Sequence, residues 1–108
     1  MEINWQPHAT KALREIYRFY ARLNTRVADK IVDTILSAVA RLSVSPEMAP
    51  IEQQLEGLPD IYRSVVAHKL FKVVYVVDKD AEQIVIISVW DCRQNPEKLR
   101  RGIIRTKS

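Results

Sequence analysis

The sequence predicts an α+β fold in which an N-terminal strand and an antiparallel helical hairpin pack on a mainly antiparallel four-stranded sheet. Two stretches with the apolar spacing of helices lie within residues 8–42. Three strand-like stretches follow within residues 62–91, and one short stretch precedes the helices. Helices grouped before strands are typical of α+β proteins. We therefore expect one domain over residues 1–108, with the hairpin on one face of the sheet and the other face partly covered or forming a shallow groove.

The N-terminal half is expected to hold one strand and the two helices. Residues 2–5, EINW, are extended in pattern and end just before a proline-containing step. Asn24 and Thr25 interrupt the helical period and supply side chains that cap a second helix. The short break predicts an antiparallel hairpin over residues 8–42. Three arginines spaced four apart share an exposed face of the first helix, namely Arg14, Arg18 and Arg22.

The C-terminal half is expected to supply the rest of the sheet. A segment with three prolines and Gly57 links the helices to strands expected at residues 62–67, 70–77 and 83–91. The turn DKDAE between the last two strands is typical of a hairpin. After the third strand, Pro96 and the sequence EKLRRGI predict one further helical turn.

The charge is unevenly distributed along the chain. Residues 1–61 contain seven Lys and Arg against eight Asp and Glu, whereas residues 62–108 contain ten against five, giving net charges of −1 and +5. A basic half predicts a polyanionic partner such as RNA, or an acidic protein. A solvated basic surface explains the same count without any partner.

Several function classes are not expected from this sequence. No apolar stretch approaches the roughly 20 residues that span a bilayer, and the N-terminus has no signal-peptide pattern. A single cysteine, Cys92, forms neither an internal disulfide nor a zinc site, and His8 and His68 lack partners at ligand spacing. We expect a cytoplasmic protein without a membrane partner, a metal or a cofactor.

Cations on the expected strands are the most informative feature. Lys72 alternates with branched aliphatic residues, so it must extend to solvent, pair with an acid, or line a groove. One interpretation is structural, with Lys72 covering an open sheet face. The functional interpretation is that Arg63, Lys72 and Arg93 converge on one side of the sheet and bind phosphates.

The segments LEGLPDIYRSVV, KLFKVVYVVD and IVIISVWDCRQNP, with the preceding helix, resemble the RelE/ParE superfamily of bacterial toxins. The resemblance covers nearly the whole chain in the same order of elements. It implies a compact α+β toxin of a type II toxin–antitoxin system, of the kind that acts in plasmid stabilisation or stress response. It also implies a cognate antitoxin protein that wraps the toxin with an extended or helical segment.

The resemblance leaves two targets open. The RelE-like branch cleaves mRNA on the ribosome, and Arg63 and Lys72 match positions where that branch carries functional cations, with Arg93 as a C-terminal arginine. Val65 stands where a second strand lysine is common, and no tyrosine or histidine follows Trp90. The ParE-like branch poisons DNA gyrase and needs no nuclease residues.

The remaining catalytic candidates are acid–base groups. His68 has a side chain whose near-neutral pKa suits a general base, although a solvated histidine at a strand end is the simpler interpretation. Asp91 is the other candidate base, and it can equally orient Arg93 through a bidentate pair. The nuclease is the first hypothesis and the gyrase poison is the alternative. A third is a toxin fold that survives only as a binding module.

Overall fold

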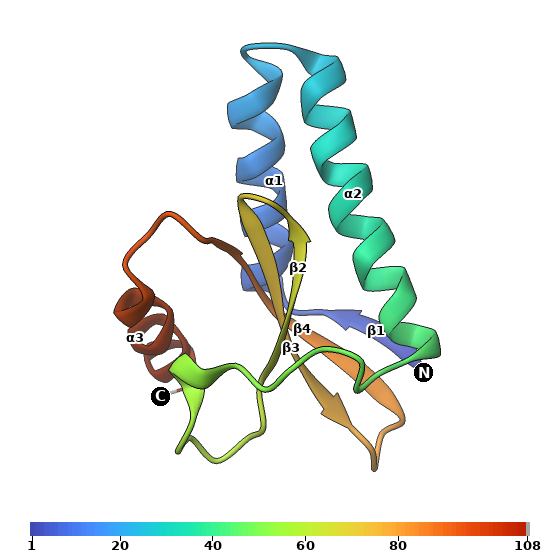
Figure 1. The fold of residues 1–108 in the computed structure, drawn as a ribbon, viewed down its shortest axis with the longest axis vertical. Helices are drawn as coiled ribbons and strands as arrows, with labels where there is room; N and C mark the ends of the chain where they lie inside the picture. Colours follow the sequence, from blue (N-terminus) through green and yellow to red (C-terminus); the bar gives the residue numbers. More distant parts are fainter. Residues whose placement is uncertain (108) are drawn as a thin grey trace.

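The computed structural model describes residues 1–107, in which a long helical hairpin stands against a four-stranded sheet and projects beyond it (Figure 1). No helix in this described part of the chain is long and apolar enough to cross a membrane. The elements in chain order are β1 (Glu2–Trp5), α1 (Pro7–Ala21), α2 (Thr25–Val44), the short 3₁₀ helix η1 (Gln53–Leu55), β2 (Arg63–His68), β3 (Phe71–Asp78), β4 (Gln83–Asp91) and α3 (Pro96–Lys107).

The hairpin prediction is confirmed, because α1 and α2 run antiparallel on either side of a short turn (Figure 1). Pro7 lies in the first turn of α1, where its missing N–H would have no helical partner. Asn24 caps α2, since its Oδ1 accepts a hydrogen bond from the Arg26 N–H at 2.9 Å. The start of each helix is therefore specified by a local residue.

Replacing Asn24 with alanine is expected to lower the free energy of unfolding by about 1 kcal/mol, the usual cost of losing an N-cap. The Arg26 N–H would lose its side-chain acceptor, while the buried apolar side chains of α2 stay unchanged. Urea denaturation measures the effect. Asn24→Ser should recover most of the loss, and an equal loss with serine would contradict a capping role.

The strands pair in the order β1-β4-β3-β2. The last three strands pair antiparallel with one another, as expected, and β1 joins the far edge parallel to β4. Two irregularities interrupt the ladders, one between Val66 and His68 and one between Val74 and Tyr75. These shifts decide which side chains share a face, because a slip of one residue moves a side chain to the opposite face.

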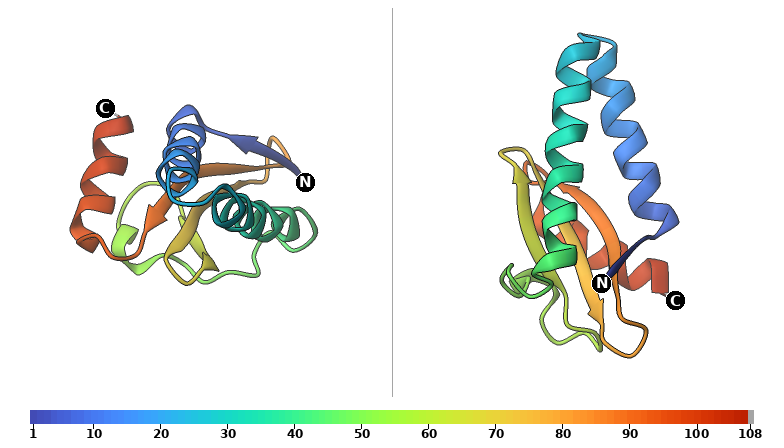
Figure 2. Two further views of the ribbon diagram at one scale, coloured as in Figure 1. Left: turned by 90° about the horizontal axis from the view of Figure 1, so that it is seen from above. Right: turned by 90° about the vertical axis from the view of Figure 1, so that its right-hand side faces the viewer.

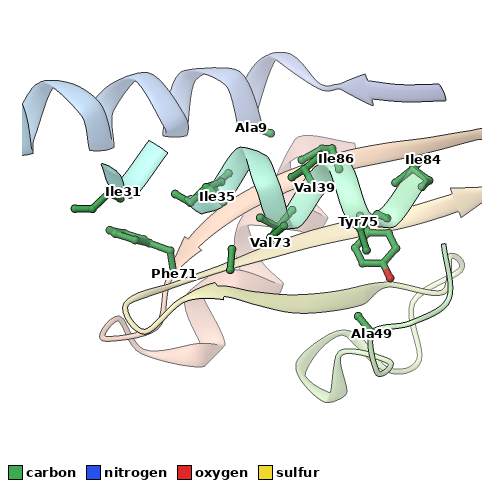
Figure 3. Close-up of a cluster of buried hydrophobic side chains, with 14 residues drawn as sticks. Ala9, Ile31, Ile35, Val39, Ala49, Phe71, Val73, Tyr75, Ile84 and Ile86 are labelled. Atoms are coloured by element: carbon green, nitrogen blue, oxygen red, sulfur yellow. The ribbon is translucent and has the colours of Figure 1, made fainter. Parts of the chain in front are cut away.

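One face of the sheet packs on the hairpin and forms the larger core (Figure 3). Alternate residues of β3 point into it, and Trp5 packs against its margin. The helix α2 supplies the opposing side chains. The fully or nearly fully buried members drawn and labelled in Figure 3 are Ala9, Ile31, Ile35, Val39, Ala49, Phe71, Val73, Tyr75, Ile84 and Ile86.

The second face of the sheet is covered by the C-terminal helix and η1. Leu99 and Ile103, four residues apart on α3, are buried against Leu55, Tyr62 and Val74, with Trp90 at the margin. The prediction of a single helical turn after Pro96 was therefore too short, because α3 runs for 12 residues. An apolar i, i+4 pair with a sheet face to cover stabilises the longer helix.

Candidate functional site

Arg63 begins β2 and lies on the hairpin face of the sheet. It pairs directly with Tyr75 across β3, and directly opposed residues share a face. Its Nη1 donates a hydrogen bond to the Ala49 carbonyl oxygen at 2.8 Å. The buried Tyr75 hydroxyl donates to the Pro46 carbonyl oxygen at 2.7 Å. Both side chains therefore hold the segment after α2 against the sheet.

Lys72 lies on the other face and is paired with Glu52. Its Nζ makes an ion pair with Glu52 Oε1, and the two side chains are only 19% and 6% exposed. Glu52 also accepts hydrogen bonds from the Gln54 N–H at 3.0 Å and the Ser64 hydroxyl at 3.2 Å. Since each polar group has a partner, the pair is a satisfied, half-buried network.

The pKa of Glu52 reflects this network. Burial by itself raises the pKa of the carboxyl group, but the hydrogen bonds from Lys72, Gln54 and Ser64 and the Lys72 charge together outweigh burial. The pKa consequently lies below its ordinary value of 4.5. Glu52 is ionised at neutral pH and neutralises the lysine that the sequence singled out.

The prediction that Arg63, Lys72 and Arg93 converge on one side of the sheet was wrong. Tyr75 and Lys72 are three residues apart on β3, so they point to opposite faces, and Arg63 follows Tyr75 to the hairpin face. Lys72 shares its face with Val66 and Trp90 instead. The register between the strands separates these cations. Apolar spacing in the sequence does not predict that register.

Arg93 follows β4 and is held by Asp91. Its Nε donates to Asp91 Oδ1 at 3.0 Å and its Nη2 donates to Oδ2 at 2.9 Å, so both carboxylate oxygens are engaged. The side-chain hydrogen bond from Arg93 lowers the pKa of Asp91 below its ordinary value of 3.8. A carboxylate with a lowered pKa is a weak base, so Asp91 orients the guanidinium, which is the second role considered for it above.

His68 lies at the turn between β2 and β3. Its Nδ1 accepts a hydrogen bond from the Leu70 N–H at 3.2 Å, so the neutral ring carries its proton on Nε2. In this neutral ring Nε2 is then a donor rather than a proton acceptor. The ring lies 6.0 Å from that of Phe71, which also makes an edge-on contact with Tyr20 at 6.3 Å.

Three of the five predicted site residues gather at one end of the sheet. His68, Phe71 and Asp91 are register partners across β2, β3 and β4, and Arg93 follows immediately. We call Tyr20, His68, Phe71, Asp91 and Arg93 the Phe71 cluster. Its aromatic members were expected only as core residues, and Glu52 was hidden in an irregular segment, so no sequence signal marked them.

The family model described as "ParE toxin of type II toxin-antitoxin system, parDE" matches residues 3–96. No curated protein matches the chain in a search by sequence.

Three solved structures share the fold. A chain of the chromosomal ParDE toxin–antitoxin system from P. aeruginosa superposes with a TM-score of 0.68 at 23% identity, covering 84% of this chain and 95% of that chain. The isolated E. coli RelE toxin gives 0.59 at 17% identity and covers 97% of both chains. The YoeB dimer from Staphylococcus aureus gives 0.55 at 22% identity, covering 82% of this chain and 92% of that chain.

Proposed function

Because the chain belongs to the ParE toxin family of type II toxin–antitoxin systems, we propose that it stops growth by binding DNA gyrase in the cytoplasm rather than by cutting mRNA. It is the toxin component of such a system, and the family implies an antitoxin partner. The α+β fold is common to the ParDE and RelE structures. The choice between the two targets therefore depends on the arrangement of the candidate site residues.

The separation of the strand cations carries the proposal. Cleavage of RNA through its 2′-hydroxyl requires a base, a cation at the phosphorane and an acid within reach of one phosphate. Lys72 is neutralised by Glu52 on one face, while Arg63 holds a backbone carbonyl on the other. A site divided between two faces of a sheet does not serve one phosphate.

The acid–base candidates support the same conclusion. Asp91 is engaged by Arg93 through both oxygens, and the free nitrogen of His68 is a donor in the neutral ring. These residues position an exposed guanidinium, which suits binding an acidic surface more than abstracting a proton. The arginines of α1, Arg14 and Arg18, are exposed and add to the basic surface available to such a target.

A RelE-like nuclease is the second candidate, supported by the placement of His68 and Arg93 at one end of the same fold as RelE. That assignment would use the Phe71 cluster, with Arg93 at the phosphate and His68 as the acid. It would not use Lys72. The two candidates therefore differ in the expected product and agree that Lys72 is structural.

The test is controlled expression in bacteria, with DNA breaks, plasmid supercoiling and mRNA ends measured on the same samples. We expect growth arrest with DNA breaks and intact mRNA. The paired substitution Glu52→Gln with Lys72→Met removes the strand cation without leaving a buried charge, and growth arrest should stay within about threefold. Loss of a phosphate-binding cation would cost about 100-fold or more. New mRNA ends without DNA breaks would overturn the proposal.

A further inference from the structure

The outer side of α1 carries a row of exposed cations. Lys11, Arg14, Arg18 and Arg22 are all exposed and follow one another at steps of three, four and four residues. Side chains at these spacings lie on one face of a helix. Arg22 is the C-cap and still has helical backbone angles, so the row continues to the hairpin turn. We call these four residues the α1 cation row.

No acid pairs with the α1 cation row in the part of the chain that the structure describes. The acid of α1, Glu15, lines the cavity between α1 and the end of β4 instead. None of the ion pairs among the described residues includes a member of the row. Like charges four residues apart on a helix destabilise it. The fold therefore gains nothing from this row, whereas an anionic ligand would.

The cations of the other two helices are placed differently. On α3, Arg100 donates hydrogen bonds to the Gln54 and Glu56 carbonyl oxygens at 3.2 and 2.7 Å. Arg101 pairs with Glu97 at 3.8 Å. On the outer face of α2 acids are interspersed with cations, and the charged residues there are Arg26, Asp29, Lys30, Asp33 and Arg41. The α1 cation row is thus the helix face best suited to a polyanion.

The shape of the row suits a straight ligand. From Lys11 to Arg22 it is about 16 Å long. One strand of duplex DNA carries a negative charge at about every 3.4 Å of the helix axis, on the outside of the duplex. Both helices of the hairpin extend well past the end of the sheet (Figure 2, right). A rigid duplex can therefore lie along the outer side of α1 without meeting the sheet.

The surroundings of the row favour a duplex over a single strand. Proteins that bind single strands combine cations with aromatic side chains on which bases stack. The exposed aromatic residues of α1, Tyr17 and Phe19, lie about 100° around the helix on either side of the row. The row itself offers arginine side chains, which bind phosphate oxygens through forked hydrogen bonds. Contacts of this kind position a protein on DNA without reading bases.

We propose that the α1 cation row binds the phosphate backbone of duplex DNA, independently of its sequence. The binding chemistry rests on the row alone. That the DNA is the segment held by gyrase rests on the proposed function, and the toxin would then contact the substrate of gyrase as well as the enzyme. Four phosphate contacts predict that the logarithm of the affinity falls with the logarithm of the salt concentration with a slope of about −3.6.

The experiment measures fluorescence anisotropy of a labelled duplex of about 20 base pairs, titrated with the full chain at several salt concentrations. The variant with Arg14→Gln, Arg18→Gln and Arg22→Gln should bind at least about tenfold more weakly at about 0.1 M salt, and its slope should fall to about −1. The matching replacements with lysine keep the charge and should recover most of the affinity. No binding by the wild-type chain, or an unchanged slope in the glutamine variant, would overturn the proposal.

A matched control separates the row from the net charge of the chain. The variant with Lys98→Gln, Arg101→Gln and Arg105→Gln removes three exposed cations from α3 and gives the same net charge of +1. It should change the affinity by less than about threefold, because charges farther than about 10 Å from the duplex are screened at this salt concentration. Equal losses in the two variants would mean that overall charge binds DNA, and would overturn the proposal. The melting temperature of the α1 variant should not fall, since like charges are removed.

Two further ligands test the choice of a duplex. A duplex of the same length with a scrambled sequence should bind within about twofold, because phosphate contacts carry no sequence information. A single-stranded RNA of the same length should bind more weakly. An RNA that binds as tightly as the duplex, with the same loss in the α1 variant, would overturn the proposal.

These outcomes are independent of the gyrase assay, since DNA binding is measured on the purified chain alone. A chain that cuts mRNA but binds duplex DNA through α1 would refute the proposed function and support the α1 cation row. A chain that breaks DNA in cells, but whose α1 and α3 variants bind the duplex equally well, would do the reverse.

Discussion

Replacing Glu52 with alanine is expected to lower the free energy of unfolding by about 3 kcal/mol, the low end of the range for breaking a buried ion pair. The substitution leaves Lys72 half-buried without a counter-charge and removes the acceptor of the Ser64 hydroxyl. The value is at the low end because Lys72 is 19% exposed and its long stem can carry the charge toward water. Urea denaturation at neutral pH measures it.

Two controls separate this effect from a general loss of charge. The ion pair between Lys79 and Glu47 lies on the surface, with side chains 74% and 51% exposed. Glu47→Ala should therefore change stability by less than about 0.5 kcal/mol. Replacing both members of the buried pair, with Glu52→Gln and Lys72→Met, should restore most of the lost stability. Equal losses for Glu47→Ala and Glu52→Ala would contradict the assignment.

The same pair sets a pH dependence with a defined sign. The pKa of Glu52 is lower in the folded chain than its ordinary value of 4.5. Its contribution is therefore fully present above pH 4.5 and is lost as the pH falls through the folded pKa, because the unfolded chain binds the proton first. The stability difference between the wild-type chain and Glu52→Gln should shrink as the pH falls from 5 to 3. A constant difference would mean that the charge of Glu52 is not involved.

The elements of this fold were predictable because each has its own local signal. Helical apolar spacing, the Asn24 cap and alternating strands lie in the sequence itself, and the observed bounds of the hairpin and the strands differ from the expected ones by a residue or two, whereas α3 is longer than expected. The Lys72 environment was predictable only as a choice between solvent, a partner and a groove. Its partner Glu52 comes from an irregular segment 20 residues away, which no periodicity connects to β3.

The arrangement of the candidate site was not predictable because it depends on register. Arg63 pairs with Tyr75 and Val66 pairs with Lys72, so Arg63 lies on the hairpin face and Lys72 lies on the opposite face with Trp90. No local signal shows which residue of β3 lies opposite Arg63. The pairing of Asp91 with Arg93 was foreseen as one of two roles because it is local, two residues apart. Contacts between residues close in the sequence could thus be predicted, whereas the grouping of residues from different strands could not.

The C-terminal helix provides the second large expected effect. Replacing Leu99 with alanine should lower the free energy of unfolding by about 3 kcal/mol, within the usual range for a buried leucine. Leu99 is 2% exposed and packs with Leu55, Tyr62 and Val74 on the face of the sheet away from the hairpin. The substitution removes apolar contacts there and leaves a cavity that helix and sheet close only in part.

Ile104 offers a matched control in the same helix, because it is 48% exposed. Ile104→Ala should cost less than about 0.5 kcal/mol in the same urea titration. The comparison also tests how far the folded unit extends, since the family model ends at residue 96, where α3 begins. A loss for Leu99→Ala no larger than that for Ile104→Ala would mean that α3 is an appendage. The expected difference means that α3 completes the second core and supports the sheet face on which Lys72 pairs with Glu52.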